Sequence, residues 1–141
     1  MNERRVLTRF EMTVERGKIQ EFARATGATD PAYFGEDPPV PPTFLISAAH
    51  WRPFDAPLPY ESLGMDLRRV LHGEQEFRFH GPPPRAGARL TVEVRIESLT
   101  SKQSRRGGLM RIALIVTDFT DEHGRLVAES RSTTLETGAP E

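Results

Sequence analysis

The second half of the chain alternates between apolar and polar residues, and this pattern constrains the fold more than any other feature. In residues 90–97 every second side chain is apolar, and residues 74–80 follow the same alternation, which is the period of a half-buried β-strand. Residues 109–119 are apolar on both parities, which predicts a central strand whose outer face a second subunit could cover. Residues 126–135 then complete the sheet, after a hairpin turn at Asp121–Gly124.

One amphipathic helix is predicted ahead of these strands. Residues 15–26 place apolar side chains at the spacing of one helix face and charged side chains on the other. Thr13 or a neighbouring residue would cap its start. Gly27 stands where a residue in the left-handed conformation commonly ends a helix.

The segment Thr43–Trp51 has a different character. From Phe44 onward only Ser47 and His50 are polar, two prolines precede the segment, and Pro53 follows it. A helix that is apolar nearly all round is a buried helix. A buried strand is the alternative, but the alanine content and the proline entry favour a helix.

Composition excludes several classes of function. The 19 basic and 20 acidic residues give a net charge of −1, so electrostatics offers no case for a nucleic-acid or membrane partner. The absence of cysteine excludes disulfides and thiolate chemistry. No apolar run approaches the ~18 residues that a membrane span needs, and no pair of histidines has the spacing of metal ligands. We therefore expect a soluble, cytoplasmic protein without a metal.

These elements predict an α+β fold in one domain, residues 1–141, with residues 138–141 as a frayed tail. Long antiparallel strands twist and coil strongly, and a single buried helix is the natural element for such a sheet to wrap. The prediction is therefore a coiled antiparallel sheet around a central buried helix. An ordinary α+β sandwich fits the same pattern almost as well.

Several segments resemble a known family, the amino-terminal domain of MaoC-like dehydratases, which is FAS1-like and related to (R)-specific enoyl-CoA hydratases. The resemblance runs in order over about residues 10–137 and is carried by Val14–Ile19, Glu21–Ala23, Pro41–Phe44, Leu71–Phe77 and Pro84–Gly87. It implies the hotdog fold. It also implies thioesters of coenzyme A or acyl carrier protein as substrates, addition or elimination of water across the 2,3 bond, and no further cofactor.

This chemistry needs a group that moves the C2 proton and a group that handles the hydroxyl. In active relatives the segment Gly-Asp-x-Asn-Pro-x-His supplies an aspartate and a histidine, and Gly27–Tyr33 corresponds to it here. Ala28 stands at the aspartate position and cannot carry a proton. Tyr33 stands at the histidine position and, with a reference pKa of ~10, is a poor base near neutrality. Asp30 takes the asparagine position.

The resemblance thus implies a subunit without catalytic residues. We expect it to shape the acyl channel of a catalytic MaoC-like hotdog partner, in a heterodimer or heterotetramer of a 3-hydroxyacyl-thioester dehydratase or enoyl-CoA hydratase. Without this partner we expect the chain to form a homodimer. One alternative is a self-sufficient homodimeric thioesterase or hydratase that works with Asp30, Tyr33 or His72. Another is an acyl-thioester binding protein that catalyses nothing.

Motif positions and the apolar segment together suggest which residues border the substrate. The candidates are Tyr33, Thr43, Phe44, Ser47, Trp51, His72 and Gly73. Free backbone N–H groups at the start of the apolar segment could also stabilise a polarised thioester oxygen. The competing interpretations are core packing for the two aromatic residues of that segment, a bond to its own backbone for the serine, and a structural role for the histidine.

Overall fold

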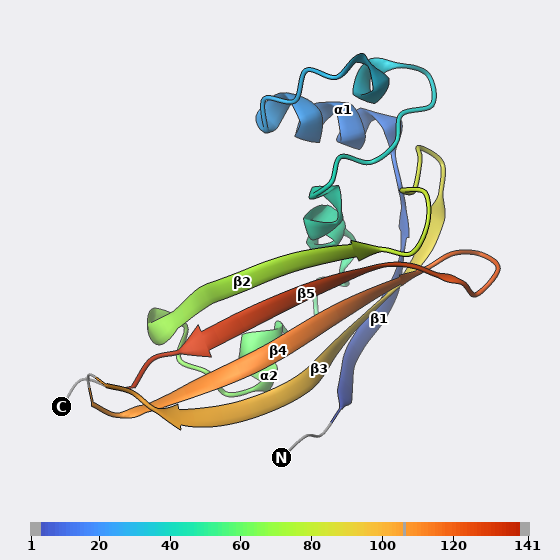
Figure 1. Cartoon of the computed structure of the whole chain (residues 1–141). Helices are drawn as coiled ribbons and strands as arrows, with labels where there is room; N and C mark the ends of the chain where they lie inside the picture. The colour runs from blue at the N-terminus through green and yellow to red at the C-terminus, as the bar shows by residue number, and fades with distance from the viewer. Residues whose placement is uncertain (1–3, 106, 139–141) are drawn as a thin grey trace.

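The computed structural model describes residues 4–105 and 107–138. Its main element is a five-stranded antiparallel sheet in the order β1-β3-β4-β5-β2 (Figure 1). The strands are β1 Arg5–Thr13, β2 Val70–Phe79, β3 Arg89–Gln103, β4 Leu109–Thr120 and β5 Leu126–Glu136. The helices are α1 Arg16–Ala25, η1 Pro31–Phe34, η2 Phe44–Trp51, α2 Pro59–Ser62 and η3 Leu67–Arg69.

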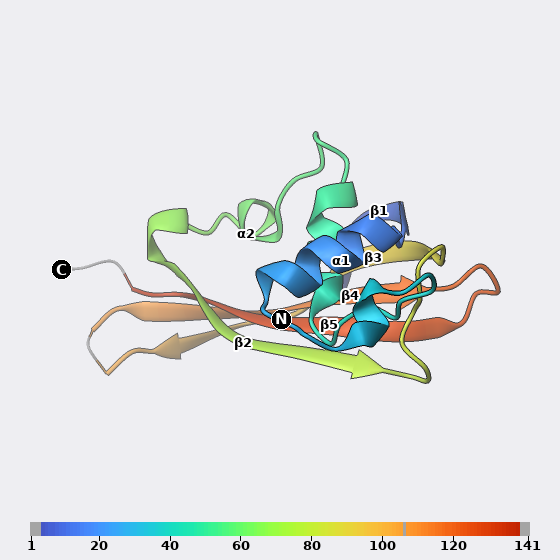
Figure 2. The same ribbon diagram turned by 90° about the horizontal axis from the view of Figure 1, so that it is seen from above.

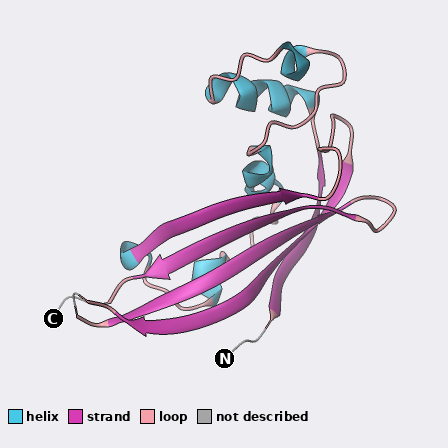
Figure 3. Cartoon of the chain, in the orientation of Figure 1, coloured by secondary structure: helices cyan, strands magenta, loops and turns pink. Residues whose placement is uncertain are grey.

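The segments η2 and α2 lie on one face of the sheet, as the view from above shows (Figure 2). The long strands curve along their length, and η2 sits inside the curve (Figure 3). This confirms the predicted α+β arrangement, in which a coiled sheet wraps a helix. The larger hydrophobic core lies between the sheet, α1 and η2, and a smaller cluster is built around Met65, Ala113 and Ile115.

The predicted strands are confirmed, and β4 occupies the centre of the sheet, as its apolar residues on both parities indicated. Val116, on the outer face, has no exposed surface, and its register neighbours are Arg95 and Arg131. Arg95 forms an ion pair with Asp118 at 3.0 Å and another with Glu97. Apolar stems of long side chains can cover a neighbouring apolar residue. The chain therefore buries Val116 itself, whereas Leu114 on the same face is half-buried. The second subunit expected over this face stays a prediction.

The helix predicted over residues 15–26 is confirmed as α1. Of the predicted caps, Thr13 or a neighbouring residue, Thr13 itself is wrong, because it belongs to β1, where it pairs with Arg89. Glu15 is the N-cap residue and makes no capping bond with its side chain. At the other end Gly27 has a φ of 71°, a conformation that glycine adopts without steric cost. The chain then turns into η1, beyond the end of the sheet (Figure 1).

The predicted helix over Thr43–Trp51 is confirmed as η2, with Phe44, Leu45 and Ala48 buried, but it is a 3-10 helix and one of its flanks is open. Its bonds span three residues, as from the N–H of Ile46 to the carbonyl of Thr43 at 3.2 Å. Phe44 and Leu45 are buried, whereas the Ile46 side chain is 52% exposed. The sheet covers η2 from one side only, and the apolar residues of the other side remain open. A 3-10 helix of this length is uncommon.

A cluster of charged residues, which we call the clasp, holds the end of the sheet against the α2–η3 connection; its members are Asp66, Arg69, Arg111 and Glu136. The carboxylate of Glu136, a residue only 4% exposed, accepts bonds from the Asp66 N–H at 2.7 Å, Arg69 Nη2 at 3.1 Å and Arg111 Nη1 at 3.0 Å. The Asp66 backbone N–H and then Arg111 hold the pKa of Glu136 below its usual value, although burial opposes them. Arg111 also donates to the Leu63 carbonyl at 2.7 Å.

Within residues 4–105 and 107–138, no helix is both long enough and apolar enough to cross a bilayer. The frayed tail expected at residues 138–141 falls mostly outside the part of the chain that the structure describes, since only Gly138 belongs to it.

Candidate functional site

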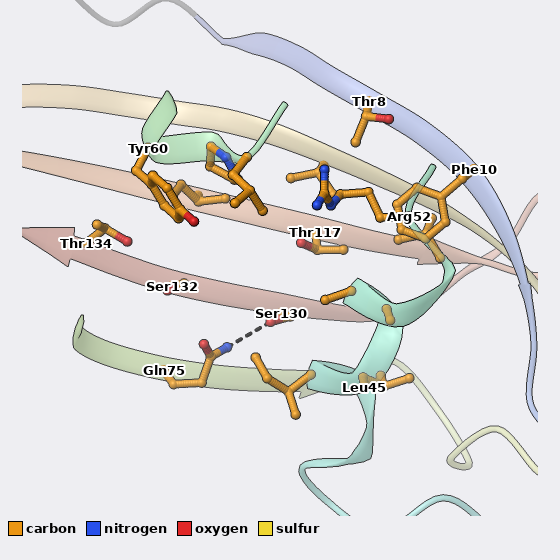
Figure 4. A pocket seen from close by; sticks show the side chains of 18 of the residues that line it. Thr8, Phe10, Leu45, Arg52, Tyr60, Gln75, Thr117, Ser130, Ser132 and Thr134 are labelled. Carbon is orange, nitrogen blue, oxygen red and sulfur yellow. Dashed lines mark hydrogen bonds between the residues drawn. The ribbon is translucent and has the colours of Figure 1, made fainter. Parts of the chain in front are cut away.

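A cavity of about 290 Å³ lies between the inner face of the sheet and the segments η2 and α2 (Figure 4). We call it the sheet cavity. Its lining residues are Thr8, Phe10, Leu45, Ile46, Ala48, Ala49, Arg52, Pro57, Leu58, Pro59, Tyr60, His72, Gln75, Val92, Val94, Ile115, Thr117, Ser130, Ser132 and Thr134. Its volume is close to the lower end of the roughly 300–1,000 Å³ of small-molecule sites.

Most of the sheet cavity is apolar. The flank of η2 that includes Leu45 and Ile46 forms one wall, and Val94 and Ile115 from the sheet form another. Burial of hydrocarbon against such walls is favourable by about 0.8 kcal/mol for each methylene group. The cavity can therefore hold an alkyl or acyl chain.

A row of hydroxyl groups runs along β5 on the same inner face. Ser130, Ser132 and Thr134 all line the sheet cavity. The amide of Gln75 donates to the Ser130 hydroxyl at 2.7 Å, and the Nε2 atom of His72 lies 3.1 Å from the Ser132 hydroxyl. These groups form a polar border opposite the hydrocarbon walls, and they could accept bonds from or donate bonds to oxygen atoms of a ligand.

The hydroxyl row was not predicted, although the sequence holds a signal for it. In β5 the residues on the inward parity run from the fully buried Ala128 through Ser130, Ser132 and Thr134. Three polar residues in succession on the face that should be apolar are a departure from the strand pattern. Such a departure indicates either a polar cavity or an interface.

Arg52 is the second feature that the sequence analysis missed. It follows η2 directly, and its Nη1 atom donates to the Ala56 carbonyl. Its Nε atom is enclosed and has no hydrogen-bond partner among the described residues. Figure 4 shows the guanidinium group directed into the sheet cavity. Among the described residues no aspartate or glutamate lines the cavity, so this lining has an excess of positive charge.

Of the seven residues expected to border a substrate, His72 lines the sheet cavity and the others do not. Phe44 is fully buried in the larger core and touches the Phe22 ring edge-on, with ring centroids 5.6 Å apart. The hydroxyl of Ser47 donates to the Phe44 carbonyl at 2.7 Å. Trp51 lines a separate polar cavity of about 550 Å³ near the β4–β5 hairpin.

The remaining candidates lie at the edges of the fold. Thr43 is exposed at the start of η2, and Tyr33 is half-buried against the larger core. Gly73 lies where the register between β2 and β5 shifts, and a Cβ atom there would lie 3.1 Å from the Leu135 side chain. Close packing against Leu135 is thus a sufficient reason for glycine at this position. The substrate contacts of these residues stay predictions.

The segment that corresponds to the catalytic motif lies beside α1, beyond the end of the sheet (Figure 1). The N–H of Ala28 donates to the Ala23 carbonyl at 2.8 Å. The Asp30 carboxylate accepts a bond from the Ala32 N–H at 2.9 Å and so caps η1. None of the residues from Gly27 to Tyr33 lines the sheet cavity.

The other histidines lie outside the cavity. His80 lies 2.8 Å from the Glu129 carboxylate, and His50 and His123 are exposed. In the described part of the chain no three histidine, aspartate or glutamate residues gather in a way that could hold a metal ion.

Comparison with known proteins gives matches over nearly the whole chain. The sequence model of a family described as "FAS1-like, dehydratase domain region" matches residues 4–130. A UPF0336 protein of Streptomyces griseus subsp. griseus is 39% identical over 123 residues, which span 81% of this chain and 77% of the relative.

Two solved structures have the same fold. A C-terminally truncated HadBC (3R-hydroxyacyl-ACP dehydratase) complex from Mycobacterium tuberculosis superposes with a TM-score of 0.72 at 23% identity, covering 95% of this chain and 97% of that one. A MaoC-like dehydratase superposes with a TM-score of 0.75 at 22% identity, covering 99% of this chain and 42% of that one. At these identities the likeness establishes the hotdog fold.

Proposed function

Since the chain belongs to the FAS1-like dehydratase-region family of MaoC-like hotdog proteins, we propose that it is the non-catalytic subunit of a heteromeric dehydratase. The substrate class is a 3-hydroxyacyl thioester, or in the reverse direction an enoyl thioester, of coenzyme A or acyl carrier protein. The sheet cavity of this subunit holds part of the acyl chain. A catalytic hotdog partner supplies the aspartate and histidine, and the assembly works in the cytoplasm without a further cofactor.

One observation carries this proposal. At the positions of the family's catalytic pair stand Ala28, which has no ionisable group, and Tyr33, a poor base near neutral pH. Asp30, the acid in the same segment, has its carboxylate engaged in capping η1. A proton-transfer group must lie within hydrogen-bond reach of its proton, and this segment contributes nothing to the lining of the sheet cavity.

Two surfaces are suited to a hotdog partner. β2 is an edge strand of the sheet, and its Leu71 side chain is 55% exposed. An edge strand presents unpaired N–H and carbonyl groups that another chain can pair with. The open flank of η2, with Ile46, adds an apolar area on the inner side of the sheet. HadBC, which shares this fold, is itself a complex of a 3R-hydroxyacyl-ACP dehydratase.

Isolation of the native assembly tests the proposal. The tagged full-length chain is purified from its host, and the bound protein is identified by mass spectrometry. We expect a hotdog protein with an intact Gly-Asp-x-Asn-Pro-x-His segment and enoyl-thioester hydration by the complex. Replacement of the partner's aspartate should abolish turnover. A stable homodimer that catalyses hydration unaided would contradict the proposal.

A second candidate, a self-sufficient thioesterase, has one observation in its favour. The Nε2 atom of His72 lies 3.1 Å from the Ser132 hydroxyl inside the sheet cavity, and a histidine in contact with a serine is the beginning of a nucleophile–base pair. In that case water would cleave the thioester to a carboxylate and a thiol. Cleavage of acyl-CoA that is lost in both His72→Ala and Ser132→Ala would establish it.

A third candidate, a binding protein without catalysis in any assembly, predicts a stoichiometric acyl-thioester complex. Addition of the purified partner would then leave turnover at zero. Hydration by the reconstituted pair separates this case from the non-catalytic subunit that we propose.

A further inference from the structure

We propose that the sheet cavity takes a ligand whose hydrocarbon chain bears a carboxylate, and that Arg52 binds this carboxylate. The inference rests on the proposed function, which assigns the sheet cavity to an acyl chain. It goes further, because it names the polar group that the chain must carry and the residue that recognises it.

The Nε donor of Arg52 is the first feature that points to a ligand. Nearly all buried polar groups in native proteins have a hydrogen-bond partner, and each exception calls for an explanation. The Nε atom of Arg52 is such an exception among the described residues. It lies on a side chain that lines the sheet cavity. A ligand oxygen in the cavity would supply the partner that the protein does not.

The positive charge of Arg52 is the second feature, and it points to an anion. Arg52 takes part in no ion pair among those that the described residues form, and its Nη1 atom donates to the Ala56 carbonyl, which carries no net charge. Within residues 4–105 and 107–138, no carboxylate lines the sheet cavity. A guanidinium group that loses water without gaining a counter-ion is costly. A carboxylate is the group whose charge and planar geometry match a guanidinium.

The arrangement of the walls of the sheet cavity is the third feature, and it points to a ligand with a hydrocarbon chain. Hydrocarbon surface from η2 and the sheet encloses most of the cavity, and Arg52 directs its guanidinium into the same space (Figure 4). A ligand must therefore combine an apolar chain with one anionic group. The hydroxyl row of β5 offers further contacts to oxygen atoms, but hydroxyl groups carry no charge and do not select an anion over an alcohol.

Two sources could provide such a ligand. One is a free fatty acid, whose only polar group is the carboxylate. The other is a thioester of a dicarboxylic acid, whose far end is a carboxylate while the near end is attached to the carrier. The chemistry that Arg52 would recognise is the same in both, and matched ligands distinguish them.

Calorimetric titration of the full-length chain tests the proposal. The ligands are decanoate and 1-decanol, and then the coenzyme A monothioester of decanedioic acid and decanoyl-CoA. We expect decanoate to bind about tenfold to a hundredfold more tightly than decanol, the range of a hydrogen-bonded charge. Arg52→Gln should remove this preference, and Arg52→Lys should keep part of it. Arg9→Gln, an exposed arginine outside the cavity, is the matched control and should retain all of it.

A second readout does not depend on affinity. The Nε–H signal of Arg52 in a ¹H–¹⁵N spectrum should move downfield when decanoate is added and should stay in place with decanol. A preference for the dicarboxylic monothioester over decanoyl-CoA would identify the carrier-bound source. The absence of that preference, together with selective decanoate binding, would identify the free acid.

The outcomes separate this inference from the proposed function. If decanoate and decanol bind with equal affinity and Arg52→Gln changes neither, the carboxylate inference is overturned while the assignment of the cavity to an acyl chain stands. If none of the four ligands binds the full-length chain, both are overturned.

Discussion

Two groups of arginines in this fold stand in opposite situations. At the clasp, Arg69 and Arg111 surround the buried carboxylate of Glu136, and each makes a charged hydrogen bond of 3.0–3.1 Å. In the sheet cavity, the enclosed Nε atom of Arg52 has no hydrogen-bond partner in the part of the chain that the structure describes. Side chains of the same type thus form charged hydrogen bonds at the clasp, whereas in the sheet cavity one arginine donor lacks a partner among the described residues. The clasp stabilises the fold, and the Nε donor of Arg52 in the cavity is available to the carboxylate of the proposed ligand.

The clasp should carry the largest effect on stability. Glu136→Gln removes the negative charge from a site where one backbone and two guanidinium donors meet. Breaking a buried pair costs about 3–5 kcal/mol, and because both arginines are partly exposed we expect about 2–3 kcal/mol. Urea denaturation measures this loss. Glu36→Gln, at a side chain that is 99% exposed, is the control and should change stability by less than about 0.5 kcal/mol. A Glu136→Gln variant as stable as this control would contradict the role of the clasp.

The same carboxylate predicts an acid dependence. The pKa of Glu136 is lower in the folded protein than its usual 4.5, so the folded state binds fewer protons than the unfolded state. The stabilisation is complete above the unfolded-state pKa and is lost as pH falls below about 4.5 through the folded-state pKa. Denaturation midpoints between neutral pH and pH ~3 measure it. Glu136→Gln should show a shallower decline than the wild type, and parallel curves would disprove the assignment.

The same change to glutamine, made once at the clasp and once in the sheet cavity, sharpens the comparison. Arg111→Gln removes bonds to Glu136 and to the Leu63 carbonyl, and we expect a loss of about 1–2 kcal/mol in the free energy of unfolding. Arg52→Gln removes one bond to a carbonyl and also an unpaired charge, so the change should stay within about 1 kcal/mol in either direction. The two variants are measured side by side by urea denaturation. Equal losses in the free energy of unfolding would contradict the distinction between the arginines of the clasp and Arg52.

The open flank of η2 should show the smallest effect on stability. Ile46 is 52% exposed, so Ile46→Ser should lower the free energy of unfolding of the isolated chain by less than about 0.5 kcal/mol. If a partner covers this flank, the same substitution should weaken the assembly by about tenfold or more. Analytical ultracentrifugation with the purified partner measures the second quantity. Unchanged association would exclude Ile46 from the interface.

The strands of the sheet could be predicted well, because apolar and polar residues alternate along a half-buried strand with a period of two. Residues 109–119 revealed a central strand through their apolar character on both parities, and β4 lies at the centre. The helix α1 was equally clear from its spacing. In both cases the information lies in a short stretch of sequence and does not depend on what packs against it.

The segment η2 could be predicted as a helix but not as an open 3-10 helix. Its side chains are apolar nearly all round, and hydropathy alone does not distinguish burial in a core from exposure to a cavity or a partner. Only the packing of the sheet and α1 around η2 decides that Phe44 is buried while Ile46 is open.

The sheet cavity was the hardest feature to predict, because its lining comes from segments far apart in the sequence. Arg52 and Ser132 are separated by 80 positions, and only the fold brings them to one space. His72 was found through its motif position. Arg52 belongs to no motif. It is a candidate because its Nε atom lacks a hydrogen-bond partner among the described residues, and a sequence does not show hydrogen bonds.

The most direct test of the whole account is the rate of enoyl-CoA hydration by the purified chain as a catalytic hotdog partner is titrated in. The account predicts no hydration by the chain alone, with crotonyl-CoA as substrate, and a rate that rises to a plateau at equimolar partner. Turnover by the pure chain before any partner is added would contradict it.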